Sequence, residues 1–414
     1  MSVMLYSTPV QTRFSRRLSW PAVPNDISRL RSKLLAEGKD LLDLSESNPT
    51  RVGLPSLLAP DAEGADPFAG EAKTLYAPDP RGLATAREAL ARFYASGRGG
   101  RPAASIDPSR LFLCASTSEA YGWLFKLLCD PGDAVLVPRP GYPLFDYLAG
   151  LEAVEARPYR LEYRHPRGWR LDLESIEDDL RGGGVRAVVV INPNNPTGSY
   201  LARDERRALL ELCGGFGVAV IADEVFFGFP VEAGPRSSFV GEDGALVFVL
   251  DGLSKLLGLP QAKLGWIACS GPSRELEEAM GRLEIIADSY LSAGTPVMSA
   301  LPGLLRRAET FGDAARGRIA ANMTALREAL EGPDSPHRLL RCEGGWTALI
   351  ESPRLASEEE LASGLLREAG LWSQPGYFFD MEREAFFTAS LILPAERLAE
   401  GARRYREHFR GLLA

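Results

Sequence analysis

Histidine and cysteine are scarce in this 414-residue sequence, and both scarcities exclude classes of protein. Three scattered histidines argue against a histidine-based metal centre and against a serine–histidine–aspartate hydrolase. The five cysteines are widely spaced and flanked by apolar residues, which predicts buried free thiols instead of disulfides or metal ligands. We therefore predict no metal site in this protein.

The sequence also lacks an excess of basic charge and long apolar runs. Its 47 basic residues stand against 55 acidic ones, and the net charge of −8 argues against nucleic-acid or anionic-membrane binding. No apolar run approaches the roughly 18 residues of a membrane span, and the N-terminus has no secretory apolar core. With 45% hydrophobic residues, we expect a globular cytoplasmic protein of two or three domains that acts on small molecules.

Three common motifs are missing as well. No G-x-G-x-x-G follows a predicted strand, which disfavours a dinucleotide site, and no G-x-x-x-x-G-K-[ST] indicates a P-loop. A G-x-S-x-G serine nucleophile is also absent. The chemistry of this chain must therefore come from other residues.

Lysine is rare enough to be informative. Six of the 47 basic residues are lysines and the other 41 are arginines. An amine forms a Schiff base, whereas a guanidinium stays protonated and does not. The six lysines are Lys33, Lys39, Lys73, Lys126, Lys255 and Lys263. Lys255 lies in an apolar loop after a predicted strand, so it is the candidate for amine chemistry.

Short apolar runs separated by helical stretches predict a largely parallel α/β sheet with helices on both faces. The runs are Leu111–Ala115, Ala134–Pro138, Ala187–Asn192, Val218–Ala222, Leu246–Leu250 and Leu264–Cys269. The predicted helices between them include Glu119–Leu128 and Arg203–Cys213, the second capped by Asp204 or a nearby polar residue. About thirteen residues separate the last two runs, which is short for a crossover helix, so we expect the sixth strand to be antiparallel.

The chain is predicted to divide into two folding units. The segment Thr50–Gly70 is rich in proline, glycine and aspartate, which indicates a loop or a domain boundary. Predicted strands near Trp346–Glu351 and Phe387–Leu393, together with amphipathic helices, indicate a smaller α+β domain. We expect residues 1–50 to form an arm and the first part of that domain. Residues 51–298 would form the large domain, and residues 299–414 the rest of the small one.

Polar clusters follow five of the predicted strands, at the sheet edge where open α/β proteins bind ligands. They are Ser116-Thr117-Ser118-Glu119, Pro140-Gly141-Tyr142-Pro143, the loop 192–198, Asp223-Glu224 and Asp251-Gly252-Leu253-Ser254-Lys255. Each has an ordinary explanation by itself; Ser116, for example, is a plausible helix cap. Together they combine a phosphate-binding helix N-terminus, an aromatic ring, an acid and an amine. Pyridoxal phosphate is the cofactor that uses all of these.

These residues also form a recognisable pattern. Asn195-Pro196-Thr197-Gly198 is followed by Asp223-Glu224-Val225 and then by Ser254-Lys255-x-x-Gly258-Leu259-Pro260. From about Leu44 onward the sequence resembles the class I/II aminotransferases, which are fold-type-I pyridoxal-phosphate enzymes and usually homodimers with shared active sites.

The resemblance implies a role for each matching residue. Lys255 would hold the cofactor as a Schiff base and move protons, and Asp223 would pair with its pyridine nitrogen. The other implied cofactor contacts are Asn195 on the ring oxygen, Tyr142 on the ring face, Thr117, Ser118, Ser254 and Lys263 on the phosphate, and Tyr76 from a second subunit. Thr295 would also lie at the subunit interface.

Three positions depart from the family pattern. Lys263 and Phe226 stand where the family usually has arginine and tyrosine. Thr388 stands where the family has the arginine that clamps the substrate carboxylate, and the nearest arginine is Arg383. Either the substrate is held in an unusual way or another arginine supplies the cation, and the candidates are Arg13, Arg16, Arg17, Arg51 and Arg383. Around Leu291 the chain is apolar where a dicarboxylate-specific member carries a second arginine. An ordinary aspartate transaminase is therefore disfavoured.

We interpret the chain as a pyridoxal-phosphate-dependent aminotransferase that moves an amino group from an amino acid or related amine to a keto acceptor. The alternative is a lyase or cyclase on the same scaffold, acting by elimination or replacement at Cβ or Cγ. A transcriptional regulator with an aminotransferase-like domain is disfavoured, because the roughly 40 residues before Leu41 are too few for a helix-turn-helix extension.

Overall fold

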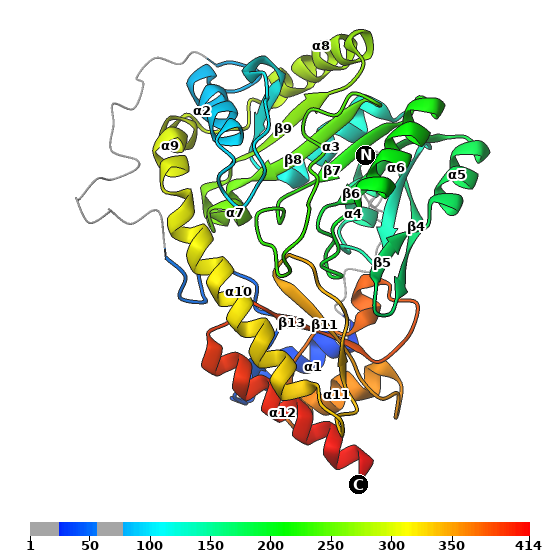
Figure 1. Cartoon of the computed structure of the whole chain (residues 1–414), viewed down its shortest axis with the longest axis vertical. Coiled ribbons are helices and arrows are strands. Elements are labelled where there is room, and N and C mark those ends of the chain that lie inside the picture. Colours follow the sequence, from blue (N-terminus) through cyan, green and yellow to red (C-terminus); the bar gives the residue numbers. More distant parts are fainter. Residues whose placement is uncertain (1–24, 56–77) are drawn as a thin grey trace, which may run out of the picture.

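An eight-stranded sheet forms the centre of the larger lobe (Figure 1). The computed structural model describes residues 25–55 and 78–414. The strands are β2 (Leu111–Cys114), β3 (Ala134–Arg139), β4 (Glu155–Arg164), β5 (Gly168–Leu171), β6 (Val185–Ile191), β7 (Ala219–Asp223), β8 (Val247–Gly252) and β9 (Gly265–Ser270). Their order is β2-β9-β8-β7-β6-β3-β4-β5, and the five strands from β8 to β4 are parallel. The predicted mostly parallel sheet is confirmed.

The six apolar runs predicted as strands coincide with β2, β3, β6, β7, β8 and β9, within two residues at each end. The last of them, β9, pairs antiparallel with β8 as predicted. The prediction missed β4 and β5, which form an antiparallel pair at the sheet edge. Most residues of β4 are polar or charged and partly exposed, so this strand lacks the apolar run typical of a buried one.

Helices cover both faces of the sheet, and alternate strand residues contact them. Val189 and Ile191 of β6 pack in a core with α3 (Thr117–Leu128), α4 (Phe145–Leu151) and α8 (Ser273–Tyr290). Val188 and Val190 point the other way. Their core includes α2 (Ala84–Ala95), α5 (Leu173–Gly182), α6 (Arg203–Phe216) and α9 (Thr295–Arg306). This two-sided burial explains why these strands contain almost no polar residues.

The polar residue that satisfies the start of helix α6 is Glu205, the neighbour of Asp204. Helix α6 begins at Arg203, its N-cap residue is Ala202, and Asp204 lies inside the first turn. The Glu205 carboxylate accepts the Ala202 N–H at 3.1 Å. Glu205 also accepts the Leu171 N–H at 2.8 Å, so one carboxylate satisfies the helix start and ties it to β5.

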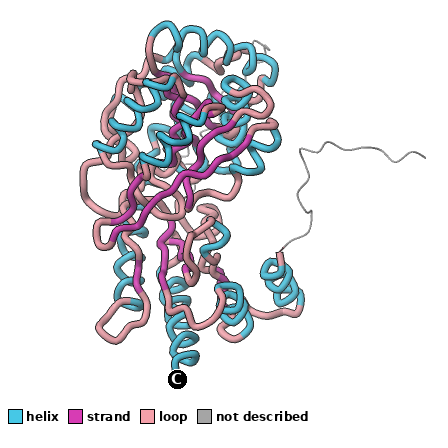
Figure 2. Tube along the Cα trace, turned by 90° about the vertical axis from the view of Figure 1, so that its right-hand side faces the viewer, coloured by secondary structure: helices cyan, strands magenta, loops and turns pink. Residues whose placement is uncertain are grey.

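The smaller lobe is built from both ends of the described chain. A three-stranded antiparallel sheet contains β10 (Arg338–Leu339), β11 (Thr347–Glu351) and β13 (Phe386–Ser390). The early strand β1 (Leu42–Asp43) pairs with β12 (Leu371–Trp372). Figures 1 and 2 show the helices around these sheets. They are α1 (Asp26–Ala36), α10 (Ala308–Leu330), α11 (Glu358–Arg367) and α12 (Ala395–Leu413).

The long helix α10 runs from the larger lobe into the smaller one (Figure 1). Its buried Phe311 meets Phe229 and Trp346 near the junction of the lobes, with ring centroids 6.3 Å apart in each pair. Within the ranges 25–55 and 78–414, no helix is long and apolar enough to cross a membrane. All five cysteines are free thiols.

Candidate active site

The polar segments after β6, β7 and β8 meet at one edge of the large sheet. Ile191 pairs with Asp223 and Asp223 with Leu250, so these three strands end side by side. The Asn192 N–H donates to the Asp223 carbonyl at 2.8 Å. The short helix α7 (Leu253–Leu256), which contains Ser254 and Lys255, follows β8 at this edge. The sequence prediction that these clusters converge agrees with this geometry.

The Lys255 amine lies in an aromatic setting between the two lobes. Its Nζ is 5.3 Å from the ring centre of Phe226 and 5.1 Å from that of Trp346. Burial lowers the pKa of Lys255, and the negative charge of Asp223 opposes part of this effect. A lysine held in this way has a larger neutral fraction than one in water, as imine chemistry requires.

Asp223 is a buried carboxylate at the last position of β7. It accepts the Tyr121 hydroxyl at 3.1 Å and the Val225 N–H at 3.2 Å. Burial raises the pKa of Asp223 to about 6, against the lowering effect of these two hydrogen bonds. Burial makes the ionised form of this carboxylate unfavourable, so Asp223 is suited to pair with a cation that a ligand supplies.

The start of α3 is the candidate phosphate cradle. Ser116 caps the helix by accepting the Glu119 N–H at 3.2 Å, which leaves Thr117 and Ser118 in the first turn, partly or fully exposed. A Cβ at Gly265 would lie 3.2 Å from the Thr117 nitrogen, so β9 passes close beneath this turn. Lys263, two residues before Gly265, is exposed with a left-handed backbone. Free helix N–H groups, hydroxyls and a nearby amine match what a phosphate needs.

Tyr142 and Asn195 lie on loops that are joined to each other. The Asn194 side chain donates to the Pro140 carbonyl at 3.0 Å, which ties the loop 192–198 to the turn that carries Tyr142. Tyr142 is 43% exposed, and burial together with the charge of Asp223 raises its pKa. Its ring is therefore accessible and close enough to Asp223 to sense its charge. Tyr76, the remaining predicted cofactor contact, lies outside the described residues.

Sequence reasoning missed two residues of this region. Tyr121 follows Thr117 by one helical turn, so its position on the same face of α3 was readable from the helix period. Trp346 is buried beside Lys255, and its indole N–H has no hydrogen-bond partner among the described residues. Trp346 stands at the start of the predicted strand Trp346–Glu351 of the smaller domain, and no local pattern predicts its approach to Lys255.

Thr388 and Ser390 lie on β13, opposite Leu349 and Thr347 of β11. Both side chains are buried, and neither hydroxyl has a partner within the described part of the chain. Strand alternation puts them on one sheet face with Leu349 and Phe386, which pack against Trp169 of the large lobe. Thr388 thus faces the junction of the lobes and offers a neutral hydroxyl there.

Arg383 lies at the protein surface beside Phe386. It is exposed, forms an ion pair of 3.3 Å with Glu351 and lies over the Phe386 ring. Glu351 follows Trp346 by five residues of strand, a separation of roughly 16 Å. Arg51, another candidate, is exposed and is 3.7 Å from Glu46. Arg13, Arg16 and Arg17 lie outside the described residues.

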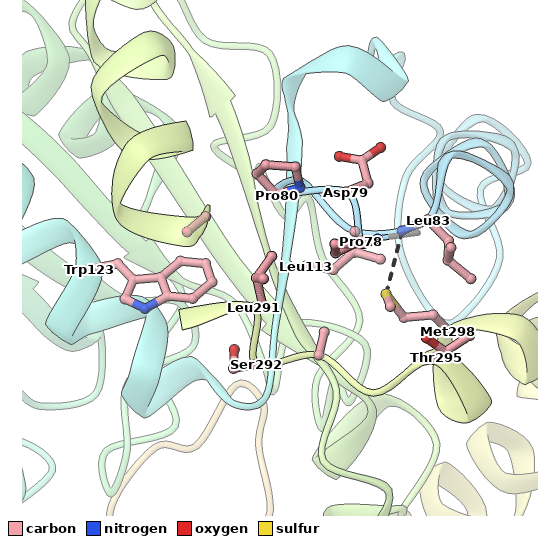
Figure 3. Close-up of a pocket in the computed structure, with 13 residues that line it drawn as sticks. Pro78, Asp79, Pro80, Leu83, Leu113, Trp123, Leu291, Ser292, Thr295 and Met298 are labelled. Carbon is pink, nitrogen blue, oxygen red and sulfur yellow. Dashed lines mark hydrogen bonds between the residues drawn. The ribbon is translucent and has the colours of Figure 1, made fainter. Parts of the chain in front are cut away.

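A pocket of about 120 Å³ lies beside the end of α8 (Figure 3). Leu291, Leu113, Trp123 and Met298 line it, and none of the thirteen described lining residues is basic. Thr295 lies at its rim and is exposed. The apolar character predicted around Leu291 therefore holds in the structure.

Replacing Asp223 by asparagine is expected to stabilise the cofactor-free protein at pH 7 by about 1–3 kcal/mol. Because the folded-state pKa is raised from 3.8 to about 6, the folded protein binds more protons than the unfolded one between those values. The stability contributed by Asp223 is therefore present below about pH 4 and lost as the pH rises to 6. Urea unfolding at pH 4 and 7 measures this, and a gain that is equal at both values would contradict it.

The chain is similar to a known enzyme family and to several of its relatives. The family described as Aminotransferase class I and II matches residues 39–404. Nicotianamine aminotransferase 1 of Oryza sativa subsp. japonica is 30% identical over 207 residues, or 49% of this chain and 41% of that protein. S-alkyl-thiohydroximate lyase SUR1 of Arabidopsis thaliana is 32% identical over 212 residues, or 49% of this chain and 44% of that protein. The match spans less than half the length of both relatives.

Among solved structures, alanine aminotransferase from Pyrococcus furiosus has a TM-score of 0.80 at 23% identity and covers 96% of this chain and 100% of its own. This likeness confirms the predicted fold, that of the fold-type-I aminotransferases with a smaller second domain. The family match extends over most of the sequence and includes every described residue of the candidate site. This chain belongs to the class I and II aminotransferase family.

Proposed function

We propose that this protein is a pyridoxal-phosphate-dependent aminotransferase that transfers an amino group from an amino acid or related amine to a keto acceptor. The observation that carries the proposal is that a buried amine and a buried acid lie at the same edge of the sheet. Burial lowers the pKa of Lys255 and raises that of Asp223, and the charge of Asp223 acts on Lys255. Such a pair suits a cofactor that bonds to an amine and presents a ring cation to a carboxylate.

The residues present fit this cofactor. Thr117, Ser118, Ser254 and Lys263 would hold its phosphate, and Tyr142 would cover the ring. Asn195 would contact the ring oxygen and Asp223 the ring nitrogen. The cofactor supplies an electron sink, and Lys255 supplies the base that takes a proton from the substrate carbon and returns it. Phe226 has no hydroxyl, so Asn195 would be the remaining side-chain partner of the ring oxygen among these residues.

Thr388 directs the choice of substrate. A bidentate arginine–carboxylate pair is strong and oriented, whereas a threonine hydroxyl offers one hydrogen bond. Three polar groups at the lobe junction have no hydrogen-bond partner among the described residues: the hydroxyls of Thr388 and Ser390 and the indole N–H of Trp346. They favour a neutral polar group on the substrate near the reacting amine. We propose a substrate that lacks an α-carboxylate there or holds it in another way.

We predict that Arg383→Ala changes kcat/KM on amine donors less than about twofold, because Arg383 pairs with Glu351 on the surface. Thr388→Arg is expected to create or raise activity on alanine or aromatic amino acids. Steady-state kinetics of both variants measure this. A loss of about 2 kcal/mol or more in Arg383→Ala would show that Arg383 holds the carboxylate and that the substrate proposal is wrong.

A lyase is the second candidate function, and the similarity to S-alkyl-thiohydroximate lyase favours keeping it. The two reactions differ in where the amino group goes. An amine-donor screen with the cofactor-loaded protein, followed at the cofactor absorption band, separates them. Conversion to the aminated cofactor supports transfer, whereas release of ammonia or of a leaving group supports a lyase.

We further propose a cytoplasmic homodimer with shared sites and the domain division 1–50, 51–298 and 299–414. Apolar side chains at the end of α8 support the dimer: Ile285 is 71% exposed, Tyr290 50% and Leu291 39%. Exposed apolar groups that gather in one place mark interaction surfaces. The adjoining pocket and Thr295 extend this surface (Figure 3). Five free thiols agree with a reducing compartment.

A further inference from the structure

A cluster of buried charges lies behind Asp223. Glu224 follows it in the chain, and Asp251 follows Leu250, its partner across β7 and β8. Glu224 and Asp251 have no exposed surface, and one cation, Arg101, is 6% exposed beside them. Buried carboxylates without compensation are costly, so the arrangement of these charges requires an explanation.

Arg101 binds both acids at once. Its Nη1 is 3.2 Å from Glu224 Oε2, and its Nη2 is 2.6 Å from Asp251 Oδ2 and 2.6 Å from the Glu224 carbonyl. The guanidinium also lies over the rings of Tyr94 and Phe227, at 5.6 and 5.1 Å. Planar recognition of this kind is specific to arginine.

Glycines bring Arg101 to this depth. Gly100 has a φ of +71°, and a Cβ there would lie 2.3 Å from the Gly228 carbonyl oxygen. The loop before β2 therefore runs directly against the loop after β7, where only glycine fits. This close approach places the Arg101 side chain beneath the strand ends.

The two acids are fully engaged by other groups. Glu224 accepts the Ser238 hydroxyl at 2.7 Å and the Phe239 N–H at 2.8 Å. Asp251 accepts the Gly252 N–H at 2.7 Å and the Tyr94 hydroxyl at 3.2 Å. These contacts engage both carboxylates, so the acids act on Asp223 through their charge.

Several groups face Asp223. Tyr121 reaches it from α3, Tyr142 lies on the loop after β3, and Lys255 comes from α7. The charges of Glu224 and Asp251 raise the pKa of Asp223 further, beyond the effect of burial. Burial raises the pKa of Glu224 and that of Asp251, the latter to about 6, and the positive charge of Arg101 opposes this effect and favours the ionised form of both acids.

We propose that Arg101 is a positioning residue of the reaction: it neutralises the Glu224–Asp251 pair, so that Asp223 stays ionised and free to pair with the ring nitrogen of the cofactor. This inference rests on the proposed function. Arg101 itself contacts neither substrate nor cofactor. Its effect on Asp223 is electrostatic, because Arg101 reduces the negative charge of the cluster that Asp223 faces.

The test measures binding of pyridoxamine 5′-phosphate from pH 5 to 8 by tryptophan fluorescence. This compound cannot attach to Lys255, so its loss of affinity at acid pH reports protonation of Asp223 together with its own titration, which is the same for every variant. We expect Arg101→Met to shift the midpoint up by about half a pH unit or more and Asp251→Asn to shift it down by a similar amount. The double variant should return close to the wild-type midpoint.

Arg87→Met is the matched control. Arg87 is also largely buried and pairs with Asp79 at 2.9 Å, but it does not contact the cluster. It should leave the midpoint unchanged. Equal midpoints in wild type, Asp251→Asn and the double variant would overturn the proposal, even where Arg101→Met fails to fold. Shifts of Arg101→Met and Asp251→Asn in the same direction would overturn it too. Absence of binding by the wild type at every pH would instead overturn the proposed function and with it this inference.

Discussion

Lys255→Ala is expected to lose at least about 10³-fold in kcat, because the lysine that would bond the cofactor and move the substrate proton is removed. The variant should still bind the cofactor through the phosphate cradle at the start of α3. Borohydride reduction of the loaded wild-type protein followed by peptide mapping should place the label on Lys255. The buried position of its amine beside Phe226 and Trp346 is the structural reason.

Two other lysines provide the controls. Lys126 lies on α3 and pairs with Glu152 at the surface, so Lys126→Ala should keep full activity. Lys263 is exposed near the phosphate cradle, and Lys263→Ala should weaken cofactor binding without abolishing attachment. Reductive labelling of Lys263 in place of Lys255 would contradict the assignment.

Asp223→Asn is expected to lower kcat by about 10²- to 10³-fold while the fold stays intact. The carboxylate at the end of β7 is the negative charge available to the ring nitrogen, and an amide in the same place keeps the shape and the Tyr121 hydrogen bond but not the charge. Steady-state kinetics combined with circular dichroism measure both effects.

Glu224→Gln is the neighbouring comparison. Glu224 points toward Arg101, Ser238 and Phe239, so its loss should cost stability, by about 1–3 kcal/mol, more than rate. We expect kcat to change less than about tenfold. Equal and mild effects of the two substitutions on kcat would mean that the roles of this acid pair have been misread.

The strands of the sheet were predictable from the sequence because a strand that is buried on both faces is a short run of apolar residues. The runs that became β6, β7 and β8 are almost entirely apolar, and each is followed by polar residues that coincide with the site. The same logic failed for β4, which contains mostly polar or charged residues, and for β5, an edge strand of four residues. At the start of α6 the prediction left open which polar residue acts, and the structure assigns this role to Glu205.

Long-range contacts limited the prediction of the site. Asp223 and Lys255 follow strands of one sheet, so their proximity was predictable from topology. Trp346 reaches Lys255 from the other lobe, and Arg101 reaches Glu224 and Asp251 through glycine contacts between two loops. No local pattern encodes such approaches. The positions of Thr388 and Arg383 likewise depended on the register of β11 and β13.

Transfer of the amino group itself is the most direct test of the proposed function. The protein, loaded with pyridoxal phosphate, is given its best amine donor labelled with ¹⁵N and then an unlabelled keto acceptor. We predict that the label appears in the aminated acceptor and that the donor is recovered as its keto product in equal amount. Release of the label as free ammonium, with the acceptor left unaminated, would contradict the assignment of this protein as an aminotransferase.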